Sequence, residues 1–117
     1  MTRKSIVVLI SGSGTNLQAI IDAQKDGRID AEIAAVISNH PDAAGLQRAQ
    51  RAGIDTVVVE PQARDDRAAY DQALIAHIDR LEPALIVLAG FMRILSDDFI
   101  EHYRNRILNI HPSLLPE

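Results

Sequence analysis

The fold is decided near the start of the chain, by the stretch Ser5-Ile6-Val7-Val8-Leu9-Ile10-Ser11-Gly12-Ser13-Gly14-Thr15-Asn16-Leu17-Gln18-Ala19-Ile20-Ile21. Residues 6–10 form a continuous apolar run rich in β-branched side chains, which is typical of a strand covered on both faces of a parallel sheet. The run breaks at a glycine-rich segment, after which Leu17, Ile20 and Ile21 recur at helical spacing. The stretch therefore predicts a buried strand, a tight turn and a helix.

The rest of the chain repeats this alternation of strands and helices. Strands are expected over residues 31–38, 56–59, 84–89 and 107–110, and helices around Leu46, Ala49 and Ala52, around Tyr70, Leu74, Ile78 and Leu81, and over residues 97–103. The alternation predicts an α/β fold, a Rossmann-like, doubly wound and mostly parallel sheet of about five strands. Ligands of such sheets bind at the carboxyl ends of the strands, where residues 11–16, 90–95 and 109–116 fall.

Composition indicates one domain and argues against several classes of protein. A chain of 117 residues with 47% hydrophobic residues suits a single compact domain. No apolar run approaches the roughly 20 residues of a membrane helix. Cysteine is absent, the net charge is −4 and aromatic residues make up 3%, which argues against disulfides, thiolate metal sites and a broad nucleic-acid surface. We therefore expect a cytoplasmic protein that binds neither nucleic acid nor a membrane.

The glycine-rich turn at residues 11–16 combines glycines with hydroxyl and amide side chains directly before a helix N-terminus. Free N–H groups and the helix dipole favour a phosphate there. Two sharper motifs fail, because Leu17 replaces the third glycine of the dinucleotide fingerprint and the P-loop lysine is missing. The alternative is a tight turn in which Ser or Thr caps the helix. We prefer a single phosphate group, as in a phosphomonoester, over NAD or ATP.

The segment Gly90-Phe91-Met92-Arg93-Ile94-Leu95 follows the fourth expected strand and is too apolar for an ordinary exposed loop. One interpretation is the wall of a pocket for a flat apolar ligand. The other is core packing beneath a loop, and residue type alone favours that second interpretation. Within the segment, Arg93 either binds a carboxylate or lies in solvent.

Asn109 and His111 stand two residues apart at the end of the last expected strand, so their side chains project from the same face. An asparagine N–H can stabilise the oxyanion of a tetrahedral intermediate by about 3 kcal/mol. A histidine can move a proton between the attacking and departing atoms. The pair predicts acyl-group transfer without a metal or a covalent intermediate. The alternative is that Asn109 is a turn-forming residue and that His111 is a hydrogen-bonded histidine at a strand end.

Several motifs together resemble a known family. They are Asn109-Ile110-His111-Pro112-Ser113-Leu114-Leu115-Pro116, Ile10-Ser11-Gly12-Ser13-Gly14-Thr15-Asn16-Leu17-Gln18-Ala19-Ile20, Val36-Ile37-Ser38-Asn39 and Leu88-Ala89-Gly90-Phe91-Met92-Arg93-Ile94-Leu95. The first resembles the signature of the folate-dependent formyltransferases, and the others narrow the resemblance to the glycinamide ribonucleotide formyltransferase family. It covers the whole chain. It implies transfer of a formyl group from the co-substrate 10-formyltetrahydrofolate to the amine of glycinamide ribonucleotide, in the purine pathway to IMP.

The resemblance also implies residue roles: catalysis by Asn109 and His111, substrate binding by Gly14, Thr15 and Asn16, and folate binding by Arg67, Met92, Arg93, Ile94, Leu95 and Asn109. The family's third catalytic residue, a downstream aspartate that orients the histidine, is not present, and the family enzyme is longer. We therefore expect one truncated N-terminal domain over residues 1–117, inactive or severely impaired alone. Without a helix after its last strand, it should expose apolar sheet surface. Whether it forms a homodimer stays open.

Three further histidines lie outside the motifs quoted above. His40, His77 and His102 have no metal-ligand spacing with His111, so surface or capping roles are expected and no metal site is predicted.

Two alternatives for the function stay open. One is a related formyltransferase or formyl-folate hydrolase, and the other is a non-catalytic module that binds a phosphorylated metabolite. The turn at residues 11–16 favours a small phosphorylated substrate over a tRNA or water acceptor.

Overall fold

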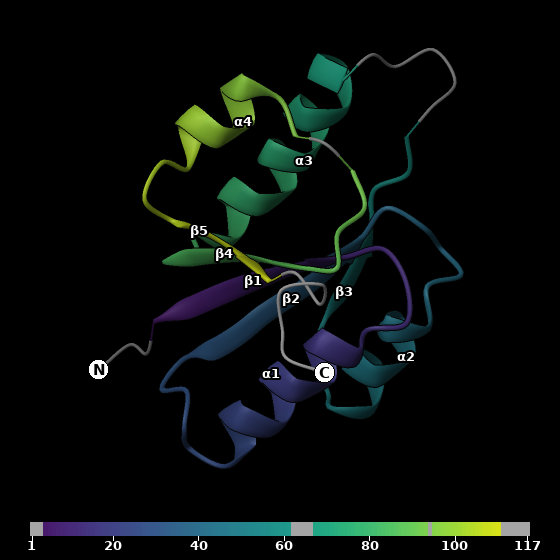
Figure 1. Cartoon of the computed structure of the whole chain (residues 1–117), viewed down its shortest axis with the longest axis vertical. Coiled ribbons are helices and arrows are strands. Elements are labelled where there is room, and N and C mark those ends of the chain that lie inside the picture. The colour runs from purple at the N-terminus through teal and green to yellow at the C-terminus, as the bar shows by residue number, and fades with distance from the viewer. Residues whose placement is uncertain (1–3, 62–66, 94, 111–117) are drawn as a thin grey trace.

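The computed structural model describes residues 4–61, 67–93 and 95–110, and strands alternate with helices throughout (Figure 1). In chain order the elements are β1 (Ser5–Ile10), α1 (Thr15–Lys25), β2 (Glu32–Ser38), α2 (Ala44–Arg51), β3 (Thr56–Val58), α3 (Arg67–Leu81), β4 (Leu85–Ala89), α4 (Asp97–His102) and β5 (Ile107–Ile110). Among the described residues, no helix combines the length and apolarity that crossing a bilayer requires.

The strands form one five-stranded sheet in the order β3-β2-β1-β4-β5, and every neighbouring pair is parallel. The central strand is β1, where Val8 pairs with Val36 on one side and Val87 on the other. The chain builds outward from β1 to β3, then crosses to β4 and builds outward again. The order therefore reverses between β1 and β4, and a crevice forms at such a point because the following connections leave the sheet in opposite directions. The predicted doubly wound α/β fold is confirmed.

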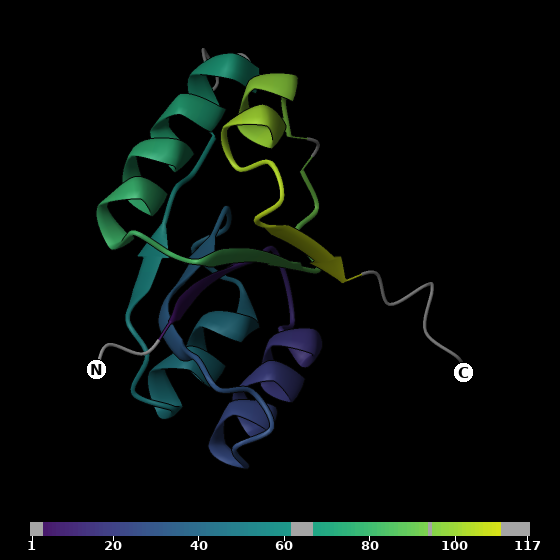
Figure 2. The same ribbon diagram turned by 90° about the vertical axis from the view of Figure 1, so that its left-hand side faces the viewer.

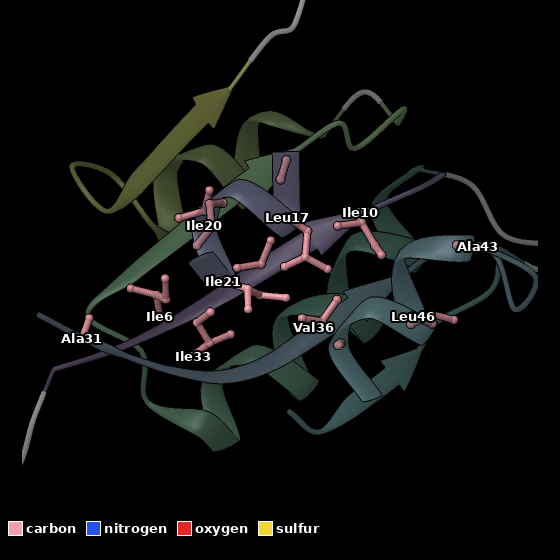
Figure 3. Close-up of a cluster of buried hydrophobic side chains, with 14 residues drawn as sticks. Ile6, Ile10, Leu17, Ile20, Ile21, Ala31, Ile33, Val36, Ala43 and Leu46 are labelled. Atoms are coloured by element: carbon pink, nitrogen blue, oxygen red, sulfur yellow. The ribbon is translucent and has the colours of Figure 1, made fainter. Parts of the chain in front are cut away.

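Two helical layers sandwich the sheet (Figure 2). The helices α1 and α2 cover one face, and α3 and α4 cover the other. The alternation of side chains along β1 feeds both layers, since Ile6, Val8 and Ile10 belong to the core cluster on the α1 side. Figure 3 shows that cluster, in which Leu17 and Ile21 of α1 lie over the strands. The other face buries Val7 and Leu9 with these residues of α3 and α4: Tyr70, Leu74, Ile75, Ile78 and Phe99.

Apolar surface is left exposed beside β5, as the sequence predicted. The side chain of Leu108 is 49% exposed, and β5 is an edge strand of the described sheet. A groove of about 480 Å³ runs beside it on the α1 side. Its apolar lining comes from Ile6, Ile20, Ile29, Ala31, Ala84, Leu85, Val87, Leu108 and Ile110.

Candidate functional site

The glycine-rich turn joins β1 to α1 through a residue whose backbone has the left-handed conformation. Gly14 is the N-cap of α1 with φ of 78° and ψ of 24°, and no side-chain hydrogen bond caps the helix. The alternative in which Ser or Thr caps α1 is therefore wrong. The first N–H groups of a helix have no partner within it, so those of α1 need an acceptor from outside the helix. An anion is the natural acceptor at such an end.

Helix α2 packs directly against the back of this turn. A Cβ placed on Gly14 would lie 2.6 Å from the Gly45 Cα, and the Gly45 N–H donates to the Gly12 carbonyl at 3.0 Å. Arg48, one turn further along α2, donates from Nε to the Ser13 carbonyl at 2.8 Å. These contacts fix the shape of the turn from outside it. Sequence patterns did not reveal Gly45 and Arg48, because both look like ordinary residues of a short polar helix.

A cavity of about 330 Å³ opens in front of the turn. Residues 11–16 line it together with His40, Ala89, Gly90 and Met92, so the carboxyl ends of β1, β2 and β4 meet here. His40 was predicted to lie at the surface; it is exposed, and it also lines this cavity. The Ser38 hydroxyl accepts from the His40 N–H at 3.0 Å and donates to its carbonyl at 2.8 Å, which orients the turn that carries the imidazole.

The connection from β4 to α4 is tied to the rest of the molecule at both ends. The Met92 N–H donates to the buried Ser11 hydroxyl at 2.7 Å, and the Ser96 N–H donates to Asp71 Oδ2 at 2.6 Å. Between them the Arg93 guanidinium lies 4.1 Å from the centre of the Tyr70 ring. Arg93 is half-buried in this stack, so the interpretation that it lies in solvent is wrong. Ile94 lies outside the described residues.

A second cavity, of about 320 Å³, adjoins the first through Met92. Its lining residues are Leu88, Phe91, Met92, Arg93, Leu95, Ile100 and Asn109. Phe91 and Leu95 pack against the core cluster on the α3 side, as the core-packing interpretation predicted, while Met92 is 83% exposed and lines both cavities. The two cavities share one wall, and that wall is the segment singled out from the sequence.

The predicted catalytic and folate residues are only partly within the described chain. Asn109 lies on β5 opposite Leu88, is exposed and lines the second cavity. His111 lies outside the described residues. Arg67 is the first residue of α3, and its side chain is not described. The structure thus brings residues 11–16, the 90–95 segment and Asn109 to one edge of the sheet.

Tyr70, which stacks on Arg93 beside the second cavity, keeps its proton. Burial raises the pKa of Tyr70 to about 12 against the opposing effect of Arg93, and its hydroxyl donates to the Val59 carbonyl at 2.7 Å. Tyr70 is therefore neutral at physiological pH. No Asp or Glu lines either cavity within the described chain. The described residues also contain no cluster of three His, Cys, Asp or Glu suited to a metal ion.

Comparisons with known proteins agree with this geometry. The family model described as formyl transferase matches residues 4–117. Phosphoribosylglycinamide formyltransferase of Escherichia coli K12 is 58% identical over 97% of this chain and 53% of its own length. The solved phosphoribosylglycinamide formyltransferase of Coxiella burnetii is 52% identical with a TM-score of 0.90, covering 99% of this chain and 55% of that one.

A third similar protein is glycinamide ribonucleotide transformylase 1 of Symbiobacterium toebii. Its crystal structure is 50% identical with a TM-score of 0.89, covering 97% of this chain and 53% of that one. The chain therefore spans about half the length of these relatives.

Proposed function

The chain belongs to the formyl transferase family, and on that premise we propose that it serves formyl transfer from 10-formyltetrahydrofolate to the amine of glycinamide ribonucleotide, a step of purine synthesis. The observation that carries the proposal is the pair of adjoining cavities at the carboxyl edge of the sheet. One is built around an uncapped helix N-terminus and the other around an apolar wall with Asn109 beside it. Two different ligands can therefore meet at Met92, which lines both.

The first cavity suits the phosphate of glycinamide ribonucleotide. Gly14, Thr15 and Asn16 open α1 and line the cavity, so their N–H groups and two polar side chains are available to phosphate oxygens. The dipole of the helix adds about 0.3–1 kcal/mol for an anion at this end. Because Arg48 already holds the Ser13 carbonyl, the turn is organised before the ligand arrives.

The second cavity suits the folate co-substrate. Phe91, Met92 and Leu95 supply apolar surface for a flat ring, and we assign Arg93, Ile94 and Arg67 to the same ligand by their family positions. The Met92 N–H is already bonded to Ser11, so this wall is also fixed in advance. A rigid wall lowers the ordering cost of binding.

In the proposed formyl transfer, Asn109 and His111 are the residues of this chain that act on the two substrates. The substrate amine attacks the formyl carbon, a C–N bond forms, and the carbonyl oxygen gains negative charge. The Asn109 amide donates to that oxygen, a contact worth about 3 kcal/mol in comparable sites. His111 takes the proton from the attacking nitrogen and returns it to N10 of tetrahydrofolate as the old C–N bond breaks, a contribution of about 10²–10⁴-fold.

Calorimetric titration of the 117-residue chain with glycinamide ribonucleotide, inorganic phosphate and a stable 10-formylfolate analogue tests the proposal. We expect all three to bind, and the ribonucleotide to compete with phosphate. Binding of the phosphate ligands alone would instead support a non-catalytic module. Binding of the folate analogue alone would support a formyl-folate hydrolase. A reduced dinucleotide is titrated as a fourth ligand, and its tight binding would contradict formyl transfer.

A turnover assay on the same chain tests the chemistry separately. Among the described residues, no Asp or Glu lines either cavity. A carboxylate neighbour is what would raise the pKa of His111 and hold its cationic form. We therefore expect turnover far below that of the longer relatives even when both ligands bind. A near-normal rate would show that His111 works without a carboxylate partner and would overturn this part of the mechanism.

A further inference from the structure

Asp71 is a buried carboxylate that the proposed chemistry does not use. It lies in the first turns of α3, and only 1% of the residue is exposed. Its Oδ2 accepts the Ser96 N–H at 2.6 Å, while its Oδ1 is buried without a hydrogen-bond partner among the described residues. Burying a carboxylate is expensive unless it is fully paired. The Ser96 N–H is the partner that the described residues provide, so the tie to Ser96 is the contact of Asp71 that can be tested.

The position of Asp71 suggests what it does. The preceding residue, Tyr70, packs against Arg93, whose guanidinium lies 4.1 Å from the centre of the Tyr70 ring. Two neighbouring residues of α3 therefore hold the β4–α4 connection, Tyr70 at Arg93 and Asp71 at Ser96. Ser96 is also the N-cap of α4, where its hydroxyl accepts from the Phe99 N–H at 3.2 Å. The hydrogen bond that Asp71 accepts from the Ser96 N–H therefore fixes the point at which the apolar wall ends and α4 begins.

Asp71 does not line either cavity, yet the segment that Asp71 and Tyr70 hold borders the second one. Leu95 precedes the held Ser96, Arg93 is held by the neighbouring Tyr70, and both line that cavity. At the other end, the bond from Met92 to Ser11 fixes the wall independently of α3. A charge-assisted hydrogen bond of 2.6 Å is among the stronger kinds that a neutral backbone N–H can make.

We propose that Asp71 is a positioning residue for the second cavity, holding its wall through Ser96 in the geometry that binds the flat ligand. The identity of that ligand, a formyl-folate, rests on the proposed function. The positioning itself rests on the hydrogen bond and the burial, which do not depend on it.

The test compares Asp71→Ala and Asp71→Asn with Asp79→Asn in the 117-residue chain. Asparagine keeps an oxygen that can accept from Ser96, whereas alanine removes the acceptor. Asp79→Asn is the matched control, because Asp79 lies on the same helix and binds Tyr103 and His102 of the α4 region instead. Amide hydrogen exchange at Ser96 is measured by NMR, and calorimetry measures binding of the 10-formylfolate analogue and of inorganic phosphate.

Asp71→Ala should speed exchange at Ser96 and weaken the folate analogue at least about tenfold, equivalent to about 1.4 kcal/mol. Phosphate affinity should stay within about twofold, since the first cavity is organised by α2. Asp71→Asn should recover most of the folate affinity, and Asp79→Asn should lower stability without a selective loss. Unchanged exchange in Asp71→Ala, or faster exchange with unchanged folate affinity, would overturn the proposal.

Two further outcomes are decisive. If Asp71→Ala does not fold, Asp71→Asn carries the test: Ser96 protection and folate affinity retained together support the role, and affinity lost with protection retained overturns it. If the wild-type chain binds no folate analogue, the proposed function fails. Exchange at Ser96 then decides by itself whether Asp71 holds the wall.

Discussion

Gly14 meets two constraints in one residue, a φ of +78° and backbone contact with α2. An alanine there would adopt a left-handed conformation that costs about 1–2 kcal/mol for an L-residue. Its Cβ would also lie 2.6 Å from the Gly45 Cα, a backbone atom that cannot move aside. We expect Gly14→Ala to lower the free energy of unfolding by about 2–4 kcal/mol and to weaken phosphate binding. Urea denaturation and phosphate titration measure the two effects.

Gly12→Ala is the matched control in the same turn. A Cβ on Gly12 would have no atom within 4 Å, so we expect a change in stability within about 0.5 kcal/mol. Equal losses in the two variants would mean that the turn tolerates no side chain anywhere, and that contact with α2 is not the reason for glycine at position 14.

Asp79 gives stability a dependence on pH. Burial alone raises its pKa, but hydrogen bonds from Tyr103 and His102 outweigh it and hold the pKa below its ordinary value of 3.8. A depressed carboxyl pKa stabilises the fold above the ordinary value, and that stabilisation is lost as pH falls through the folded-state pKa. We expect Asp79→Asn to be less stable than wild type at pH 7, with the difference shrinking below about pH 4. Urea denaturation across that range measures it, and a difference that grows toward low pH would contradict the assignment.

At the scale of elements, α2 supports the phosphate turn through Arg48. Its Nε donates to the Ser13 carbonyl at 2.8 Å and its Nη1 to Gln18 Oε1 at 3.3 Å. Removing both contacts loosens the turn, so we expect Arg48→Ala to weaken phosphate binding about three- to tenfold, equivalent to the net worth of one ordinary hydrogen bond. Calorimetric titration with inorganic phosphate measures the change.

Arg51→Ala removes the same charge from the same helix at an exposed position. Phosphate affinity should stay within about twofold there, because long-range attraction between exposed charges is largely screened beyond about 8 Å at physiological salt. If the two variants lose affinity equally, α2 acts through its charge and not by holding the turn.

The elements themselves could be predicted from the sequence because their signals are local. The apolar runs predicted strands at residues 31–38 and 84–89, and the structure has β2 at Glu32–Ser38 and β4 at Leu85–Ala89. Helical spacing identified the buried face of α3, including Leu74 and Ile78. A strand covered on both faces must be continuously apolar, so its own residues identify it without knowledge of what packs against it.

The ties that organise the site could not be predicted, because they join residues far apart in the chain. Ser11 and Met92 are 81 positions apart, and Arg48 and Ser13 are 35 positions apart. No periodicity marks which serine will meet which backbone N–H. The contact between Gly14 and Gly45 depends likewise on how α2 crosses the end of β1, which only tertiary packing decides. Residue type indicated where the site lies, but not what holds it.

For the whole molecule, the reversal of strand order beside β1 explains why both cavities lie at one edge. Connections leaving β1 and β4 diverge there, and the first cavity collects residues from the ends of both. The apolar groove lies beside β5, an edge strand of the described sheet, on the α1 side. The carboxyl edge of the sheet is thus organised for ligands, while the α1 side of β5 carries apolar surface that a globular protein rarely leaves open.

The exposed groove should make the chain associate with itself. Leu108 is 49% exposed at the groove on β5, and Val58 is 40% exposed on β3, the other edge strand of the described sheet. We expect Leu108→Lys to suppress concentration-dependent association while changing the free energy of unfolding by less than about 1 kcal/mol, since an edge lysine blocks pairing without disturbing the core. Val58→Lys is the matched control, because it adds the same charge to an edge strand whose described residues do not line this groove. Both substitutions bring the net charge of −4 closer to zero, so stronger overall repulsion cannot explain a loss of association. Sedimentation velocity over a range of concentrations distinguishes the outcomes: equal suppression by both variants would implicate any exposed edge, and a wild-type chain monomeric throughout would show that the groove drives no association.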